Sequence, residues 1–316
     1  MNILNKLNND FKNYNFQKIE SGASKKILYR LKKDDKSYIL IDFNKVENEY
    51  DDHLKIYKIL KDINISIPII IEKFDNNFIL ITEDFGDLRF DKILNNYKLK
   101  DLISYAVDTL IILKNSLPLN NHLKLPKYNL NILKNEISEL PNFYFPYIGL
   151  KNENLIDEFM YIWSQSYLNY SFSYDSFVHK DFNINNLILL PQQKDYLKCG
   201  VIDFQNSFLG ESSWDLFSLL EDSRILFSDE FNEYFIKYFY SKINLGISFS
   251  NFKMKFYFLN CTRQSRLLGR WVKLSKDYNQ NHYLNFIPVT LARLKKSINL
   301  LDDKNLITFY NKYIFN

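Results

Sequence analysis

FVHKDFNINNLILLPQQKDYLKCGVIDFQ, at residues 177–205, is the stretch that decides the fold. It holds His179, Asp181 and Asn186 in the spacing H-x-D-x-x-x-x-N, and then a second acid, Asp203, at the end of an apolar run. Hard divalent cations take oxygen ligands, which carboxylate and amide side chains supply. A further carboxylate is needed to accept or orient the proton of an attacking hydroxyl. The set therefore predicts phosphoryl transfer from ATP assisted by Mg²⁺.

Short apolar segments flank these residues. Ser176–Val178 precedes the pattern, Leu187–Leu190 follows it, and Gly200–Ile202 leads into the second acid. Such segments predict short strands that place both acids at strand ends, facing one cleft. The alternative is an ordinary solvated loop and a strand-end Asp, since the first pattern alone is common. The downstream I-D-F favours the catalytic interpretation.

The composition is that of a soluble globular protein. The 316 residues are 46% hydrophobic and 25% charged, with a net charge of +4 and no basic block. This length suits two lobes and a sizeable core, and nucleic-acid binding is not indicated. Two cysteines are too few for a zinc site or a disulfide framework. The first residues lack the apolar core of a secretion signal. We expect a cytoplasmic monomer with no membrane or nucleic-acid partner.

Alternation and turn residues in the first third predict a small sheet with one helix. The expected strands are Phe16–Glu20, Ile27–Leu31, Tyr38–Phe43, Ile67–Glu72 and Asn77–Glu83, and the expected helix is Val46–Leu60. Ser21, Gly22, Ala23, Ser24 and Lys25 form a small-residue turn that would let backbone N–H groups reach phosphate oxygens. A plain hairpin turn is the alternative. In the helix, Glu47 or Glu49 could pair with a lysine of this turn, but a solvated face is the preferred interpretation.

Glu83, Asp84 and Phe85 lead through Gly86 into helical sequence and predict a hinge between lobes, with a helix cap at Asp87. The remainder is mostly helical, from Leu102–Leu117 through Asn154–Tyr170 to the end of the chain. Residues 118–150 are expected to be irregular because they contain several prolines. Their aromatic residues either line an acceptor pocket or belong to the core.

These motifs together resemble the aminoglycoside phosphotransferase and choline kinase superfamily, a bilobal relative of the protein kinases. The narrower likeness is to bacterial anomeric kinases of N-acetylmuramate and N-acetylglucosamine. It rests on ILITEDFGD (79–87), GVIDFQNSFLGESSWDLFSLLEDSR (200–224), TRQSRLLGRWVKL (262–274) and HYLNFIPVTLARL (282–294). The resemblance covers roughly residues 14–300. It implies an α+β fold with a small antiparallel-sheet lobe at 1–83 and a large, mainly helical lobe at 84–316.

The resemblance also assigns roles. It implies that Asp181 is the catalytic base for a sugar hydroxyl, that Asn186 and Asp203 hold Mg²⁺, and that His179 holds the loop. The turn at Ser21–Lys25 would cover the phosphates of ATP, and Glu83, Asp84 and Phe85 would cradle adenine. The implied contacts or supports of the sugar are Gln205, Asp222 and Arg224. The product would serve the recycling of cell-wall amino sugars.

Two departures from related patterns stand out. The strand at Tyr38–Asp42 has no lysine where protein kinases place one to grip the α- and β-phosphates. Lys25, Lys26 or Arg30 is expected to substitute for it. Asn206 stands where relatives often have Asp directly after D-F-Q, which leaves the sugar open.

Two alternatives remain from the residues. The same fold could phosphorylate choline, ethanolamine, homoserine or an aminoglycoside, because Glu211, Glu221 and Asp222 could receive a cation. The chain could instead be a nucleotide-binding pseudokinase. Retention of all three motif residues argues against the latter.

Overall fold

The computed structural model describes residues 7–19, 25–117, 124–174 and 176–315, arranged in two compact units. One unit comprises residues 1–118 and 179–207, and the other residues 119–178 and 208–316. The first contains the sheet and residues 179–186, which carry the predicted catalytic motif and are called the catalytic loop, and the second is mainly helical. The predicted α+β class is confirmed. The predicted lobe boundary at residues 83 and 84 stays a prediction.

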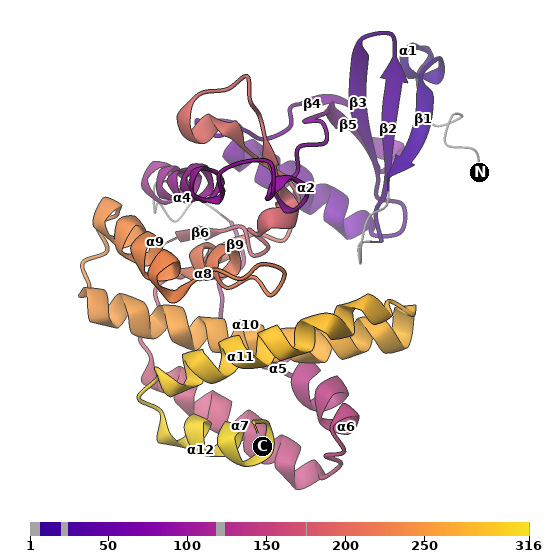
Figure 1. Cartoon of the computed structure of the whole chain (residues 1–316). Helices are drawn as coiled ribbons and strands as arrows, with labels where there is room; N and C mark the ends of the chain where they lie inside the picture. The colour runs from indigo at the N-terminus through magenta and orange to yellow at the C-terminus, as the bar shows by residue number, and fades with distance from the viewer. Residues whose placement is uncertain (1–6, 20–24, 118–123, 175, 316) are drawn as a thin grey trace. The chain divides into compact units, whose positions relative to one another are not determined.

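The first unit is built on a five-stranded antiparallel sheet (Figure 1). In spatial order its strands are β1 (Asn15–Ile19), β2 (Ile27–Lys33), β3 (Lys36–Asp42), β5 (Ile79–Glu83) and β4 (Ile70–Phe74). All five strands were predicted, although β4 begins three residues later than expected. The β2–β3 hairpin turns at Asp34, whose φ of 51° is tolerated by this residue type.

Alternation along β5 explains how the sheet is covered on both faces. Ile79 and Ile81 join a core cluster with Phe11 of the short helix α1 (Asn9–Lys12). Leu80, on the opposite face, packs with Tyr50 of helix α2 (Glu47–Leu60). Side chains two residues apart share a face of a strand, so β5 is buried on both sides.

The rest of the first unit holds the catalytic-loop stretch. Its elements are η2 (Asp75–Asn77), α3 (Phe90–Ile93), α4 (Leu99–Ser116), η4 (Ile184–Asn186), β7 (Leu187–Leu189), η5 (Asp195–Lys198) and β8 (Cys199–Val201). Strands β7 and β8 pair antiparallel, with Ile188 opposite Gly200. A Cβ at Gly200 would lie 2.7 Å from the Phe85 ring, so only glycine allows the hinge residue to pack there. The strands predicted at Leu187–Leu190 and Gly200–Ile202 correspond to β7 and β8.

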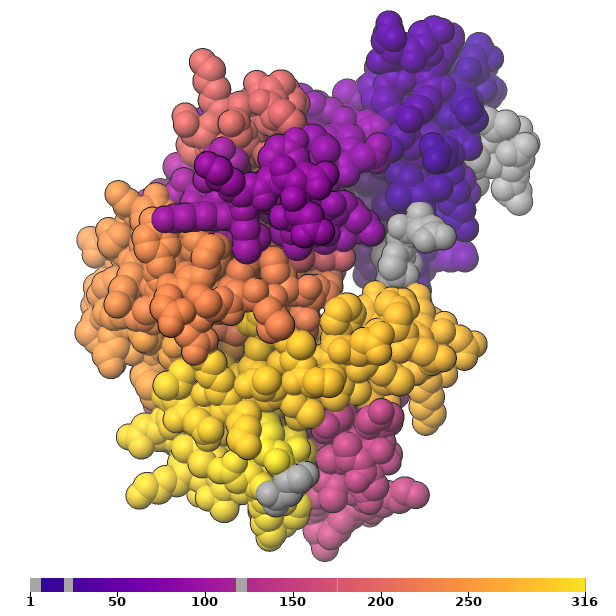
Figure 2. Space-filling view, in the orientation of Figure 1, coloured from indigo at the N-terminus to yellow at the C-terminus, as the bar shows by residue number. Residues whose placement is uncertain are grey.

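The second unit is a helical assembly with one small strand pair. Its elements are α5 (Leu130–Ile137), η3 (Leu140–Tyr144), α6 (Phe145–Tyr147), α7 (Glu153–Asn169), β6 (Ser176–Val178), β9 (Phe208–Gly210), α8 (Trp214–Leu220), α9 (Asp229–Lys242), α10 (Phe249–Tyr278), η6 (Asn281–Phe286), α11 (Ile287–Asn299) and α12 (Lys304–Tyr313). Helices α10 and α11 lie side by side in Figure 1. Figure 2 shows the orange-to-yellow carboxy-terminal helices as one continuous surface.

The expectation of irregular structure throughout 118–150 was wrong for the part that the structure describes. Asn129 caps α5 by accepting a hydrogen bond from the Ile132 N–H at 3.0 Å. Pro141 and Pro146 stand in the first turns of the helical segments that follow, where a missing N–H costs nothing. Tyr144 and Phe145 are buried, so the core interpretation is correct for these two residues, whereas Tyr147 is exposed.

Helix α10 runs close to the preceding helical segment. A Cβ at Gly269 would lie 2.0 Å from the Glu139 carbonyl oxygen, so the glycine of the R-Q-x-x-x-L-G motif permits a backbone contact. The long helix also buries Asn260, Arg263 and Gln264. Over the described ranges, no helix is both long and apolar enough to cross a membrane.

Candidate active site

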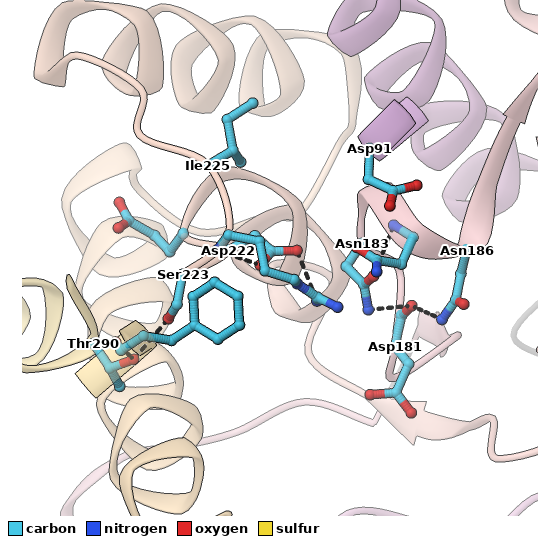
Figure 3. Close-up of polar contacts among 12 residues, drawn as sticks. Asp91, Asp181, Asn183, Asn186, Asp222, Ser223, Ile225 and Thr290 are labelled. Atoms are coloured by element: carbon cyan, nitrogen blue, oxygen red, sulfur yellow. Dashed lines mark hydrogen bonds and ion pairs between the residues drawn. The ribbon is translucent and has the colours of Figure 1, made fainter. Parts of the chain in front are cut away.

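The catalytic loop is held by the main-chain carbonyl of Asp181. This oxygen accepts hydrogen bonds from the Asn183 N–H at 2.9 Å, the Asn183 amide at 3.0 Å and the Asn186 amide at 2.9 Å. In Figure 3 the Asp181 carboxylate points away from both amides. Because the Asn186 Nδ2 atom is engaged in the loop, its Oδ1 atom is the end left to face a cation. The loop therefore presents a carboxylate and an amide oxygen.

His179 ties this loop to the strand that precedes Asp203. Its Nε2 atom lies 3.0 Å from the Ile202 carbonyl oxygen, which only accepts, so the ring nitrogen is the donor. Burial lowers the pKa of His179, although nearby Asp181 and Asp203 oppose the shift. The neutral ring thus links the two acids through backbone. The predicted loop-holding role of His179 stays a prediction.

Backbone strain is concentrated at the same two places. Lys180 and Asp203 have φ values of 79° and 67°, in the left-handed region that non-glycine residues rarely occupy. Each such residue costs on the order of 1–3 kcal/mol and persists where surrounding structure enforces it. The strain lies beside Asp181 and at the second acid, which supports a functional role for both.

Asp203 is held by a lysine and a glutamine. Its Oδ1 atom accepts from Lys26 Nζ at 2.5 Å and from Gln205 Nε2 at 3.2 Å. Burial alone would raise the pKa of Asp203, but the charge and hydrogen bond of Lys26 outweigh it, and the net shift is downward. The side chain keeps 34% of its area exposed. Asp203 is therefore an ionised carboxylate that still faces solvent.

Glu49 belongs to this cluster and is not merely part of a solvated face, which corrects the sequence interpretation. Its Oε2 atom lies 4.0 Å from Lys26 Nζ and 3.5 Å from Gln205 Nε2. Burial raises the pKa of Glu49, with Lys26 acting in the opposite direction. The alternative that Glu49 pairs with a lysine of the turn agrees with the Lys26 contact, whereas the contact with Gln205, from a distant part of the chain, was not predicted.

The donor set of the cluster fits a hard cation. Asp203 supplies carboxylate oxygen atoms, and the Gln205 Oε1 atom is buried without a hydrogen-bond partner. Asn186 is tied to the Asp203 segment through its main-chain carbonyl, which accepts from the Ile202 N–H at 3.1 Å. Among the residues that the structure describes, no three His, Cys, Asp or Glu side chains group as metal ligands. Magnesium is usually held by one or two carboxylates together with substrate phosphates. Asn186 and Asp203 match that sparse arrangement.

The hinge residues are braced by Arg30. The Asp84 carboxylate accepts from Arg30, from Ser37 Oγ at 2.5 Å and from the Gly86 N–H at 2.9 Å. Burial would raise the pKa of Asp84, but these hydrogen bonds lower it overall. Arg30 Nη1 also contacts Asp87 at 2.6 Å. Arg30 is therefore committed to this segment, which lies inside one compact unit and whose role as a hinge stays a prediction.

The other predictions for this region and for the phosphate turn have different outcomes. Glu83 donates its N–H to the Ile69 carbonyl at 2.9 Å, so that amide serves the sheet. Asp87 does not cap the next helix, because α3 begins after Arg89. Of the predicted phosphate turn, Ser21, Gly22, Ala23 and Ser24 lie outside the described residues. Lys25 is exposed and Lys26 is buried.

In the second unit, Asp222 and Arg224 form a buried fork. Arg224 Nε and Nη2 lie 2.7 and 2.8 Å from the two carboxylate oxygens of Asp222 (Figure 3). Burial would raise the pKa of Asp222, but Arg224 outweighs it, with help from Arg263. Gln205, the third predicted sugar residue, is in the first unit and bridges Asp203 and Glu49. The sugar-binding roles of all three stay predictions.

A polar network holds the segment that contains this fork. Glu221 accepts from Asn232 Nδ2 at 2.9 Å and forms an ion pair with Arg293. Gln264 donates to the Glu221 carbonyl at 2.9 Å, and Ser223 contacts Thr290 at 2.9 Å (Figure 3). The sequence motifs at 262–274 and 282–294 thus converge on residues 221–223. Sequence reasoning had linked these motifs only through family resemblance.

Comparison with known proteins agrees with this geometry. A family model described as "Phosphotransferase enzyme family" matches residues 173–244, which include the catalytic loop and Asp203. The predicted resemblance to the phosphotransferase superfamily is confirmed. N-acetylmuramate/N-acetylglucosamine kinases of Caulobacter vibrioides and Neisseria meningitidis serogroup B are each 30% identical to the chain, over 112 and 125 residues. The matches cover 35% and 38% of this chain, but only 31% and 36% of the relatives.

Solved structures confirm the protein-kinase-like fold. The ADP-bound aminoglycoside phosphotransferase APH(2'')-Ib has a TM-score of 0.61 at 15% identity, covering 93% of this chain and 97% of that one. Ethanolamine kinase from Plasmodium vivax has a TM-score of 0.61 at 18% identity, covering 92% and 83%. The matches together support the predicted class of enzyme, a phosphotransferase with a hydroxyl acceptor.

Proposed function

We propose that this protein is an ATP- and Mg²⁺-dependent small-molecule kinase that phosphorylates the anomeric hydroxyl of N-acetylmuramate or N-acetylglucosamine. The observation that supports it best is the loop in which the Asp181 carbonyl fixes Asn183 and Asn186. That loop leaves the Asp181 carboxylate pointing away from its own hydrogen bonds. The amino-sugar acceptor is inferred from the names of the two partial relatives.

In this proposal Asp181 accepts the proton of the acceptor hydroxyl as the oxygen attacks the γ-phosphoryl group, the bond from the γ-phosphorus to the bridging oxygen breaks, and ADP leaves. Asn186 and Asp203 hold Mg²⁺, which neutralises charge on the phosphates. His179 keeps the two acid-bearing segments together through the Ile202 carbonyl. Catalysis then rests on positioning and on charge stabilisation, because the protein forms no covalent intermediate.

The charges of the second unit favour a neutral or anionic acceptor over a cationic one. The three acids that could receive a cation all have partners: Glu211 binds Lys255 at 2.8 Å, Glu221 pairs with Arg293, and Asp222 is held by Arg224. A cationic acceptor such as choline would have to displace a guanidinium or an ammonium group. An N-acetylated sugar requires no such displacement.

The test is ADP release by the purified protein with ATP and Mg²⁺ against a panel of acceptors. The panel holds N-acetylmuramate, N-acetylglucosamine, glucosamine, choline, ethanolamine, homoserine and kanamycin. We expect turnover on an N-acetylated sugar, and none when its carbon-1 hydroxyl is methylated. Turnover on choline or kanamycin alone would overturn the anomeric assignment and keep the kinase. Nucleotide binding without turnover on any acceptor would favour a pseudokinase.

A further inference from the structure

Lys26 lies at a different position in the sheet from the phosphate-binding lysine of protein kinases. Strand β3 has no lysine on Tyr38–Asp42, and Lys26 directly precedes β2, whose first residue Ile27 pairs with Asp42. Its side chain is buried, and its ammonium lies 5.8 Å from the centre of the Phe43 ring. Arg30 is committed to the hinge and Lys25 is exposed. Lys26 is therefore the basic residue of this segment that the fold directs into the cluster.

The cluster has more negative than positive charge. Lys26 lies 2.5 Å from Asp203 and 4.0 Å from Glu49, so one ammonium serves two carboxylates. Gln205 contacts the same two acids through a neutral amide. Removing a buried charge from its partner is costly, so neither acid can lose Lys26 without gaining another positive group.

We propose that Lys26 exchanges partners during nucleotide binding, which deepens the proposed kinase function. Without nucleotide it holds Asp203 Oδ1 and so competes with a divalent cation for that oxygen. A nucleoside triphosphate offers Lys26 a phosphate instead, and Asp203 is released to the cation. Glu49 keeps the ammonium within the cluster in both arrangements.

The physical reason is like-charge repulsion. An ammonium and a divalent cation that share one carboxylate oxygen repel each other strongly in a partly buried site. Phosphate oxygens relieve the repulsion by taking the ammonium. Nucleotide and metal should therefore each raise the affinity for the other, by the same factor. The divalent cation alone should bind weakly.

The experiment measures free Mn²⁺ by electron paramagnetic resonance, with and without a non-hydrolysable ATP analogue. The proteins are the wild type, Lys26→Met, and Lys55→Met as a control that removes an exposed charge from the same helix as Glu49. We expect Lys26→Met to bind Mn²⁺ at least tenfold more tightly than the wild type without nucleotide. The factor by which the analogue tightens Mn²⁺ binding should fall at least tenfold. Equal Mn²⁺ affinities of Lys26→Met and the wild type without nucleotide would overturn the proposal.

A second variant tests the proposal independently if Lys26→Met does not fold. Glu49→Gln removes the carboxylate that shares Lys26 with Asp203, so the ammonium should hold Asp203 more firmly and Mn²⁺ without nucleotide should bind at least threefold more weakly than in the wild type. Tighter or unchanged binding would contradict the exchange. None of these measurements includes an acceptor, so failure of the acceptor panel and failure of the exchange are separate results.

Discussion

Two clusters of buried charge, one in each unit, use the same kinds of residue in different ways. In the first unit, Asp203 keeps a third of its side chain exposed and shares Lys26 with Glu49. In the second, Glu221 has both oxygens hydrogen-bonded, one to Asn232 and one to Arg293. The first cluster has an excess of negative charge beside strained backbone, whereas in the second the buried charge of Glu221 is paired with that of Arg293. An uncompensated negative charge beside strained backbone favours a ligand-binding role. A buried charge that is fully paired favours a structural role.

The largest expected effect tests the first cluster. Asp181→Asn should lower kcat by about 10²–10⁴-fold, because the amide cannot accept the hydroxyl proton. Stability should not change, since the main-chain carbonyl and not the carboxylate makes the loop's hydrogen bonds. Steady-state kinetics and thermal denaturation check both statements. Asp195→Asn, at an exposed acid in the same unit, is the control. Unchanged kcat would remove Asp181 as the base.

Breaking the ion pair in the second unit should lower the free energy of unfolding. Arg293→Met leaves the Glu221 charge buried without its partner, and such a loss typically costs about 3–5 kcal/mol. Urea denaturation measures the change in the free energy of unfolding. Adding Glu221→Leu should recover part of the loss, because the uncompensated charge is gone. A loss below about 1 kcal/mol in Arg293→Met would show that the two clusters do not differ as described.

Sequence reasoning found the strands and the catalytic motif because both depend on local pattern. A short apolar run predicted β5, and the spacing from Asp181 to Asn186 is that of one loop. It left Lys26 among three candidates, because the partner Asp203 is 177 positions away. For the same reason it preferred a solvated face for Glu49 over pairing with a lysine of the turn. Contacts between distant segments depend on packing, which residue patterns alone do not specify.

A smaller effect concerns the helix α2 side of the first cluster. His53 packs on Phe204, with ring centres 4.7 Å apart, and burial followed by nearby Lys26 lowers its pKa from 6.5 to about 3. The unfolded chain therefore binds a proton that the folded protein does not between these values. Stability should fall as pH drops from about 6.5 toward 3, by up to about 1.4 kcal/mol per pH unit from this group.

Unfolding curves at several pH values test this through variants. His53→Phe should reduce the pH slope, while His282→Gln, at an exposed histidine, should leave it unchanged. His53→Phe should keep part of the dependence of stability on pH, because burial also lowers the pKa of His179. Identical slopes in wild type and His53→Phe would mean that His53 is protonated in the fold.

The smallest expected effect is at an ion pair outside both clusters. Lys296 contacts Asp229, but their side chains are 34% and 75% exposed. Exposed pairs gain little because water screens them and ordering two side chains costs entropy. A double-mutant cycle with Lys296→Met and Asp229→Asn should give a coupling of about 0.2–1 kcal/mol, lost at high salt. Coupling comparable to that of Glu221 and Arg293 would show that burial is not what separates structural from incidental charge pairs here.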